Sequence, residues 1–91
     1  MKIEEKNIET VINMGALRYP ADKIASILGE DLQDVKNELL NEGSQLSTLL
    51  KRGRDMADYV LDLKLFELAK SGDINAMDRF NLLINKQKQT K

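Results

Sequence analysis

Four short breaks divide this sequence into segments with a helical pattern. They lie at residues 18–19, 29–31, 41–44 and 71–73, where Gly or Pro occurs close to residues that can cap a helix. Between the breaks, apolar residues recur at the three- and four-residue spacing of a helix face. Only five Gly and one Pro occur in 91 residues, which leaves little room for strands and tight hairpins. The pattern therefore predicts an all-α fold of five helices.

The five predicted helices cover about residues 5–17, 20–28, 32–41, 45–70 and 74–85. Pro20 fits the first position of the second helix, where its missing N–H is no loss. Gly53 falls inside the long fourth helix, where Gly costs about 1 kcal/mol relative to Ala. We therefore expect a bend or a break near Gly53.

Residues 24–40, IASILGEDLQDVKNELL, have the pattern of a helix-turn-helix. Ala25, Gly29 and Val35 have the spacing of the small residue, the turn glycine and the buried apolar residue of such units. Asp31 can cap the second helix of the pair. The pattern is typical of the motif that places its second helix in the DNA major groove.

The second helix of this pair separates its side chains by kind. At 100° per residue, apolar side chains fall on the side expected to be buried: Leu32, Val35 and Leu39. Acidic side chains fall on another side: Asp34, Glu38 and Glu42. The side that would face DNA carries Gln33, Lys36 and Asn37, which can pair with base edges or phosphates. These three are candidate DNA-binding residues, and the alternative for them is a solvated helix face.

Charge is distributed unevenly along the chain. Residues 1–48 hold five Lys/Arg and nine Asp/Glu, a balance of −4, and residues 49–91 hold nine and six, a balance of +3. The half with the helix-turn-helix is thus the acidic one, unlike the usual basic footprint on DNA. Its acids lie within the screening length of about 8 Å from the reading surface. A single copy is therefore expected to bind DNA weakly.

The densest positive cluster follows the helix-turn-helix. Lys51, Arg52 and Arg54 lie within four residues at the start of the long helix. As phosphate contacts they would add affinity that depends on salt and not on base sequence. The alternative is a patch that only aids solubility.

The long helix is apolar almost all round in its second half. Residues 56–69, MADYVLDLKLFELA, include ten apolar or aromatic residues in fourteen. One side is expected to be covered by the last helix, while the other side is formed by Met56, Tyr59, Leu63 and Phe66. Soluble monomers rarely leave such a surface exposed. These four residues are therefore predicted to form the interface of a homo-oligomer.

The sequence thus predicts two regions. Residues 1–43 form a three-helix helix-turn-helix domain, and residues 44–91 form a long helix with a C-terminal helical hairpin that serves oligomerisation. The chain has no Cys and no His, which excludes imidazole-based triads and thiolate or imidazole metal sites. No phosphate-loop glycine pattern, signal peptide or membrane-spanning run is visible. We expect a cytoplasmic protein that is not an enzyme and carries no cofactor or metal.

Residues 49–88, LLKRGRDMADYVLDLKLFELAKSGDINAMDRFNLLINKQK, resemble the C-terminal part of small terminase subunits from tailed phages and prophages. In that family a homeodomain-like helix-turn-helix is followed by a long helix with a basic, Gly-containing start. An apolar segment then ends in a leucine–alanine–lysine–small–glycine–acid run, here residues 68–73, with Ala76 three residues on. With the helix-turn-helix included, the resemblance covers nearly the whole chain.

The resemblance implies DNA recognition in phage genome packaging within a bacterial host cell. It also implies assembly into rings and a partner, the separate large terminase subunit that is an ATPase and nuclease. Two other functions fit the residues. One is a phage or bacterial helix-turn-helix transcription regulator, and the other is a helical protein–protein adaptor that does not bind DNA. Salt-dependent DNA binding separates the adaptor from the other two functions.

Overall fold

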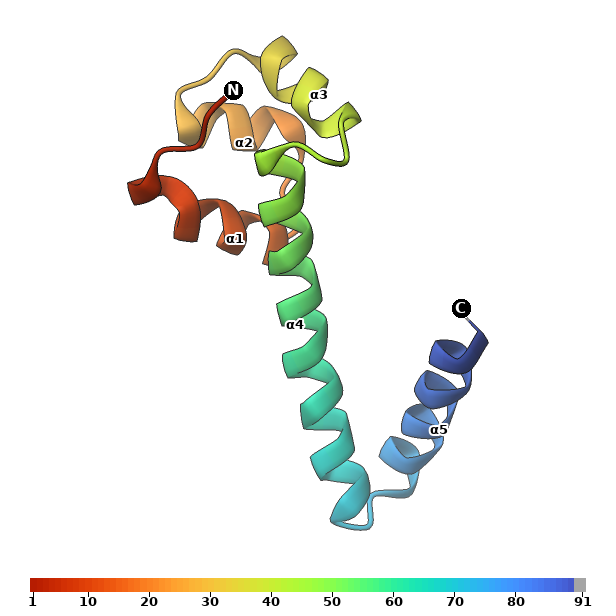
Figure 1. Cartoon of the computed structure of the whole chain (residues 1–91). Coiled ribbons are helices and arrows are strands. Elements are labelled where there is room, and N and C mark those ends of the chain that lie inside the picture. The colour runs from red at the N-terminus through yellow and green to blue at the C-terminus, as the bar shows by residue number, and fades with distance from the viewer. Residues whose placement is uncertain (90–91) are drawn as a thin grey trace. The chain divides into compact units, whose positions relative to one another are not determined.

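The computed structural model describes the backbone of residues 1–89 and the side chains of residues 1–87. Its elements are η1 (Glu5–Asn7, a 3-10 helix), α1 (Ile8–Ala16), α2 (Ala21–Leu28), α3 (Leu32–Leu40), α4 (Gln45–Lys70) and α5 (Ile74–Gln89) (Figure 1). No strand occurs in the part of the chain that is described. The predicted all-α class is confirmed: three N-terminal helices with the helix-turn-helix, a long helix, and a hairpin made with the last helix.

Several helix bounds differ from the predicted ones: residues 5–7 form the 3-10 helix η1, so that α1 begins at Ile8, and α1 and α3 each end one residue early. Pro20 is the N-cap of α2 and not its first residue, with φ −74° and ψ 167°. Its carbonyl accepts the N–H groups of Lys23 and Ile24, both at 3.1 Å. The last helix continues to Gln89 instead of ending near residue 85.

The chain forms two compact units, Met1–Ala57 and the residues from Asp58 onward. The division falls within α4, whereas the predicted boundary at residue 43 falls just before this helix. The first turns of α4 therefore belong to the N-terminal unit, and its last turns belong to the C-terminal unit.

The N-terminal unit has a core to which four helices contribute (Figure 1). Each helix supplies one of its most enclosed large side chains: Val11, Ile24, Val35 and Leu46. Burying a side chain of this size contributes about 1.5–3 kcal/mol. The first turns of α4 thus complete the core of the helix-turn-helix.

Two glycines allow α1 and α4 to cross with their backbones in close contact. A Cβ at Gly15 would overlap the backbone of Leu50, and a Cβ at Gly53 would overlap the carbonyl oxygen of Ile12. Gly53 is buried and α4 continues through it without interruption. The expected bend or break at Gly53 is therefore wrong, because this glycine is required by the helix crossing.

Three helices end in the same hydrogen-bonded cap, the Schellman motif. A residue at or just after the C-cap has a positive φ in each case: Arg18 (57°), Gly29 (69°) and Gly72 (99°). In each motif the following N–H bonds back to a carbonyl five residues earlier, such as Glu30 N to Ala25 O at 3.0 Å. These caps produce the sharp turns that start α2, α3 and α5.

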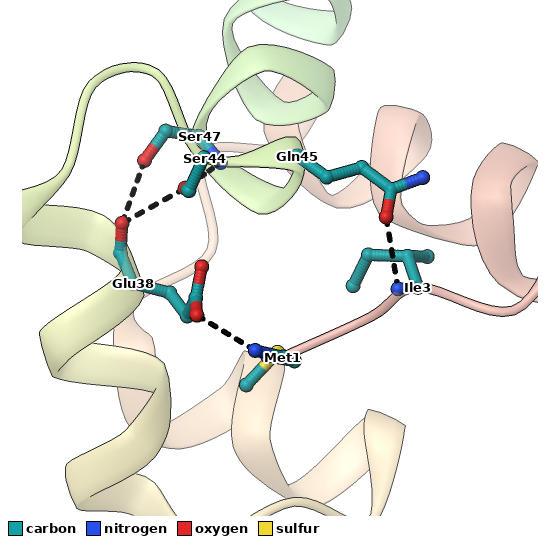
Figure 2. Close-up of polar contacts among 6 residues, drawn as sticks. All are labelled: Met1, Ile3, Glu38, Ser44, Gln45 and Ser47. Carbon is teal, nitrogen blue, oxygen red and sulfur yellow. Dashed lines mark hydrogen bonds and ion pairs between the residues drawn. The ribbon is translucent and has the colours of Figure 1, made fainter.

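The N-terminal segment folds back onto the core, a contact that no pattern in the sequence indicated. The side chain of Ile3 is buried, and its N–H donates to Gln45 Oε1 at 3.0 Å (Figure 2). The terminal ammonium of Met1 lies 2.9 Å from Glu38 Oε1. The segment thereby links the end of α3 to the start of α4.

Two serines near the start of α4 also connect this helix to α3, through the backbone carbonyl of Glu38. The hydroxyls of Ser44 and Ser47 both donate to the Glu38 carbonyl, at 2.9 and 3.1 Å (Figure 2). Ser44 Oγ also accepts the Ser47 N–H at 3.1 Å, so Ser44 caps α4 within the predicted break at residues 41–44. These bonds satisfy a carbonyl at the end of α3 that has few helical partners.

The C-terminal unit is a helical hairpin with little interior of its own. Asp73 caps α5 by accepting the Ala76 N–H at 3.0 Å, within the predicted break at residues 71–73. Phe66 and Phe80 stack with ring centroids 5.2 Å apart. Among its described residues, Ala76 is the one that is buried. Ile74, at the start of α5, is 73% exposed. The hairpin alone therefore leaves most of its apolar side chains in solvent.

Candidate nucleic-acid interface

The helix-turn-helix geometry follows from three residues at the α2–α3 junction. Ala25 is buried, which permits close approach of α3, and Gly29 adopts the left-handed conformation that the turn requires. Asp31 caps α3 by accepting the N–H groups of Gln33 and Asp34, at 3.1 and 3.2 Å. The predicted cap is confirmed, and α3 begins at the next residue, Leu32.

The outer face of α3 carries the predicted DNA-reading residues. Gln33, Lys36 and Asn37 are all exposed. Gln33 Nε2 donates to Asn37 Oδ1 at 3.1 Å, so the two amides form one hydrogen-bonded pair. Leu40 lies at the end of the same face and is 84% exposed. The face thus offers amide groups, one ammonium group and one apolar side chain to a partner.

The inner face of α3 matches the prediction only in part. Val35 is fully buried and Leu39 is half-buried, but Leu32 is 39% exposed. Leu32 is the first residue of α3, and its side chain is not buried as the helix periodicity predicted.

One flank of α3 is acidic. A hollow of about 350 Å³ is lined by Met1, Glu30, Asp34, Asn37 and Glu38. The hydrogen bond and charge of Glu38 raise the pKa of the Met1 ammonium above its ordinary value of 8.0. This ammonium offsets part of the carboxylate charge beside Asn37. No pattern in the sequence indicated this contact, because it depends on the N-terminal segment folding back.

The three cations of the basic cluster at the start of α4 do not all lie on one face of the helix. Lys51 and Arg54 are three residues apart, so they share a helix face, and both line a hollow of about 640 Å³. Arg52 is exposed and does not line this hollow. Lys51 Nζ also pairs with Asp55 Oδ2 at 2.6 Å across exposed side chains. The structure therefore places Lys51 and Arg54 together and Arg52 apart.

A second hollow, of about 290 Å³, adjoins the first and shares Leu39, Leu50 and Arg54 with it. Arg18 and Tyr19, from the turn between α1 and α2, line this second hollow. We call the two hollows together the basic groove. Leu39 of α3 lines both hollows, and Glu42, one of the three acids predicted for the acidic side, lines the larger one.

The four residues predicted to form an oligomer interface are exposed at their helix surface. Met56 lies at the end of the N-terminal unit, and Tyr59, Leu63 and Phe66 lie in the hairpin. Phe66 is partly covered within the hairpin, because its ring stacks on Phe80 and lies 5.1 Å from Lys70 Nζ. Leu61, which is not one of these four residues, is also 68% exposed. The exposed apolar surface is thus wider than predicted.

Within the part of the chain that is described, no three His, Cys, Asp or Glu residues are placed to hold a metal ion. No helix in that part is both long and apolar enough to span a bilayer. Comparison of the chain with protein-family models, with curated proteins and with solved structures finds no match.

Proposed function

We propose that this chain is a helix-turn-helix protein that binds duplex DNA as a homo-oligomer, in the manner of the small terminase subunits that it resembles. In this role it recognises viral DNA for genome packaging and contacts a large ATPase–nuclease subunit. The observation that carries the DNA-binding proposal is the outer face of α3. There Gln33, Lys36 and Asn37 stand exposed on the second helix of a well-capped helix-turn-helix.

The chemistry of this face fits base edges. Paired amides such as Gln33 and Asn37 can bond to adenine in the major groove, and a lysine can bond to guanine or to phosphate. The carboxylates of Asp34 and Glu38 lie on the flank and weaken the attraction to DNA. One copy is therefore expected to bind weakly, with phosphate contacts from the basic cluster supplying most of the affinity.

The apolar surface that the hairpin leaves exposed supports the oligomer part of the same proposal. The hairpin leaves Tyr59, Leu61 and Ile74 more than 60% exposed, although burial of apolar surface contributes about 25 cal/mol per Å². Packing against further copies would cover these side chains. Several linked helix-turn-helix units bind by avidity, often about 10²–10⁴-fold more tightly than a single unit. A weak individual reader is then sufficient.

The proposal is tested by replacing Lys51, Arg52 and Arg54 with Ala in one variant. Each phosphate contact contributes about 0.9 to the slope of log affinity against log salt. We expect weaker binding to any duplex and a slope that is flatter by up to about 3 units. Fluorescence anisotropy with labelled duplexes over a range of salt concentrations measures both quantities.

The matched variant is Lys36→Ala with Asn37→Ala. It should lower the preference among base sequences and leave more of the salt dependence in place, because base contacts carry the sequence information. A wild-type protein that binds no duplex at low salt would contradict the proposed function. An unchanged slope in the triple variant would remove the basic cluster from the interface.

A second candidate is a helical adaptor that binds another protein through the same face. The observation in its favour is the combination of Leu40, 84% exposed, with the carboxylates of Glu30 and Asp34 close to α3. An exposed leucine next to acids suits a basic, apolar protein segment better than a polyanion. Absence of DNA binding together with a stable oligomer would favour this candidate.

A further inference from the structure

Leu40 is the most exposed large apolar side chain in the described part of the chain, at 84%. It is the last residue of α3, and it belongs neither to the core of the N-terminal unit nor to the apolar residues packed against that core. The fold therefore gives no reason for an apolar side chain at this position. Isolated exposed apolar residues are common on proteins, so a role for Leu40 has to come from the residues around it.

Leu40 shares its face of α3 with the predicted DNA-reading residues. Lys36, Asn37 and Leu40 follow Gln33 after three, four and seven residues, the spacing that places side chains on one side of an α-helix. At about 100° per residue, Leu40 falls between Lys36 and Gln33, near the middle of the face. The face extends over about 10 Å along the helix axis, which corresponds to about three base-pair steps of duplex DNA.

The two amides on this face are held together. Gln33 Nε2 donates to Asn37 Oδ1 at 3.1 Å, which limits the freedom of both side chains. A carbonyl oxygen of this kind has two lone pairs, so the Asn37 amide can still accept from N6 and donate to N7 of an adenine. Leu40 lies three residues after Asn37, about 4.5 Å along the axis. Its side chain therefore reaches a base pair within about one step of that adenine.

We propose that the outer face of α3 reads A·T base pairs in the major groove, with Leu40 packed against the 5-methyl group of thymine and Asn37 bonded to adenine. This inference rests on the proposed DNA-binding function and adds to it a residue and a base preference. The thymine methyl is the one methyl group that the four bases present in the major groove. It is therefore the base feature that an isolated leucine matches, and their contact removes apolar surface of both from water.

The surroundings of Leu40 favour a base edge over an apolar protein segment. Its neighbours on the face are two amides and an ammonium group, so a partner has to offer hydrogen-bonding groups around a single apolar group. An A·T pair offers this combination in the major groove: two acceptors, one donor and one methyl group. An apolar protein helix is held instead by several apolar anchors along one groove. The carboxylates of Glu30 and Asp34 line a hollow on the flank, to which Leu40 does not contribute.

The experiment uses the full chain and the duplex that it binds most tightly from a pool with a random central segment. The same duplex is then made with 2′-deoxyuridine in place of every thymidine, which removes the 5-methyl groups and keeps the base pairing. We expect wild type to bind the uracil duplex at least about fourfold more weakly, the factor for one buried methyl group. Leu40→Ala should bind the thymine duplex more weakly than wild type and should not distinguish the two duplexes. Fluorescence anisotropy with labelled duplexes measures all four affinities.

Leu17→Ala is the matched control variant, because Leu17 is also an exposed leucine of the N-terminal unit but lies at the end of α1. It should keep the wild-type difference between the thymine and uracil duplexes. Both substitutions are at exposed positions and should leave Tm almost unchanged. The comparison of the two duplexes with wild type needs no variant at all.

Three results would overturn the inference while the proposed function stands. One is equal affinity of wild type for the two duplexes, and another is a preferred site without A·T pairs. The third is an equal loss in wild type and in Leu40→Ala, which would assign the effect of uracil to the shape and stiffness of the DNA. A wild-type protein that binds no duplex would overturn both the inference and the proposed function, and it would leave Leu40 to a protein partner.

Discussion

At the scale of single residues, the ion pair between the Met1 ammonium and Glu38 changes the charge beside α3. The ammonium of Met1 lies 2.9 Å from Glu38, beside the hollow that also contains Asp34 and Asn37. Contacts of this kind between exposed groups contribute little to stability. The contact nevertheless changes the local charge, because the Met1 ammonium lies among the carboxylates beside the outer face of α3.

The raised pKa of the Met1 ammonium predicts a specific pH dependence. A group whose pKa is higher in the folded state stabilises the fold fully below its unfolded pKa, here about 8.0, and loses this effect as the pH rises through the folded value. In a protein with no residues before Met1, the difference in Tm between wild type and Glu38→Gln should therefore be largest near pH 7. It should shrink by pH 10. Thermal unfolding of both proteins across this range measures it, and a difference that stays constant would contradict the prediction.

At the scale of secondary-structure elements, the crossing of α1 and α4 is the contact least tolerant of change. Gly15 and Gly53 are both buried at this crossing, where backbone meets backbone. Glycine in a helix normally lowers stability relative to Ala. Here the close approach outweighs that effect, because it lets α4 pack down onto the core.

Gly53→Ala should destabilise the protein even though Ala favours helix. The new methyl group would overlap the Ile12 carbonyl, and overpacking of this kind costs about 3 kcal/mol. We expect Tm to fall by at least about 10 °C. Gly43→Ala is the matched control, because a Cβ there meets only Asn41 Oδ1 at 3.5 Å. Equal Tm values for the two variants would show that α1 and α4 do not cross closely at Gly53.

The elements also show which parts of the structure were predictable from sequence. The breaks at residues 29–31 and 71–73 and the cap at Asp31 follow from local chemistry, and they were predicted correctly. Gly53 was misjudged, because a glycine that weakens a helix and one that permits a helix crossing look alike in sequence.

The residues of the candidate site also divide into those that the sequence predicted and those that it did not. The exposed positions of Gln33, Lys36 and Asn37 follow from helix periodicity on one element. Arg18 and the folded-back N-terminal segment were missed, because they become significant only through contacts with α3 and α4. A positive φ at Arg18 was hidden as well, since Arg is rarely found in that conformation.

At the scale of the whole molecule, the two units differ in how completely they bury their apolar residues. The N-terminal unit encloses side chains from four helices, whereas the hairpin fully buries Ala76 alone among its described residues. Exposed apolar surface of this extent is unusual for a soluble monomer. The contrast places the expected subunit contacts in the hairpin.

Tyr59→Asp combined with Leu63→Asp should reduce the size of the particles, because two charges in an apolar contact oppose its burial. Phe66 is avoided, since its ring stacks on Phe80 and its loss would damage the hairpin itself. Lys64→Asp is the control, because it introduces an exposed charge of the same sign on a polar position. Light scattering gives the mass, and circular dichroism checks that the helices remain. A wild-type protein that is monomeric at high concentration would contradict the prediction.

The glycine at the helix crossing also restricts how the length of this chain can change. An α-helix turns by about 100° for each residue, so one residue inserted in α4 between Gln45 and Arg52 would bring Arg52 into the place of Gly53. A deletion there would bring Arg54 into it instead. Either change puts a long side chain where the Ile12 carbonyl leaves no room for a methyl group. Natural insertions and deletions should therefore be accepted in the turn at Asn41–Gly43 and excluded from the first two turns of α4.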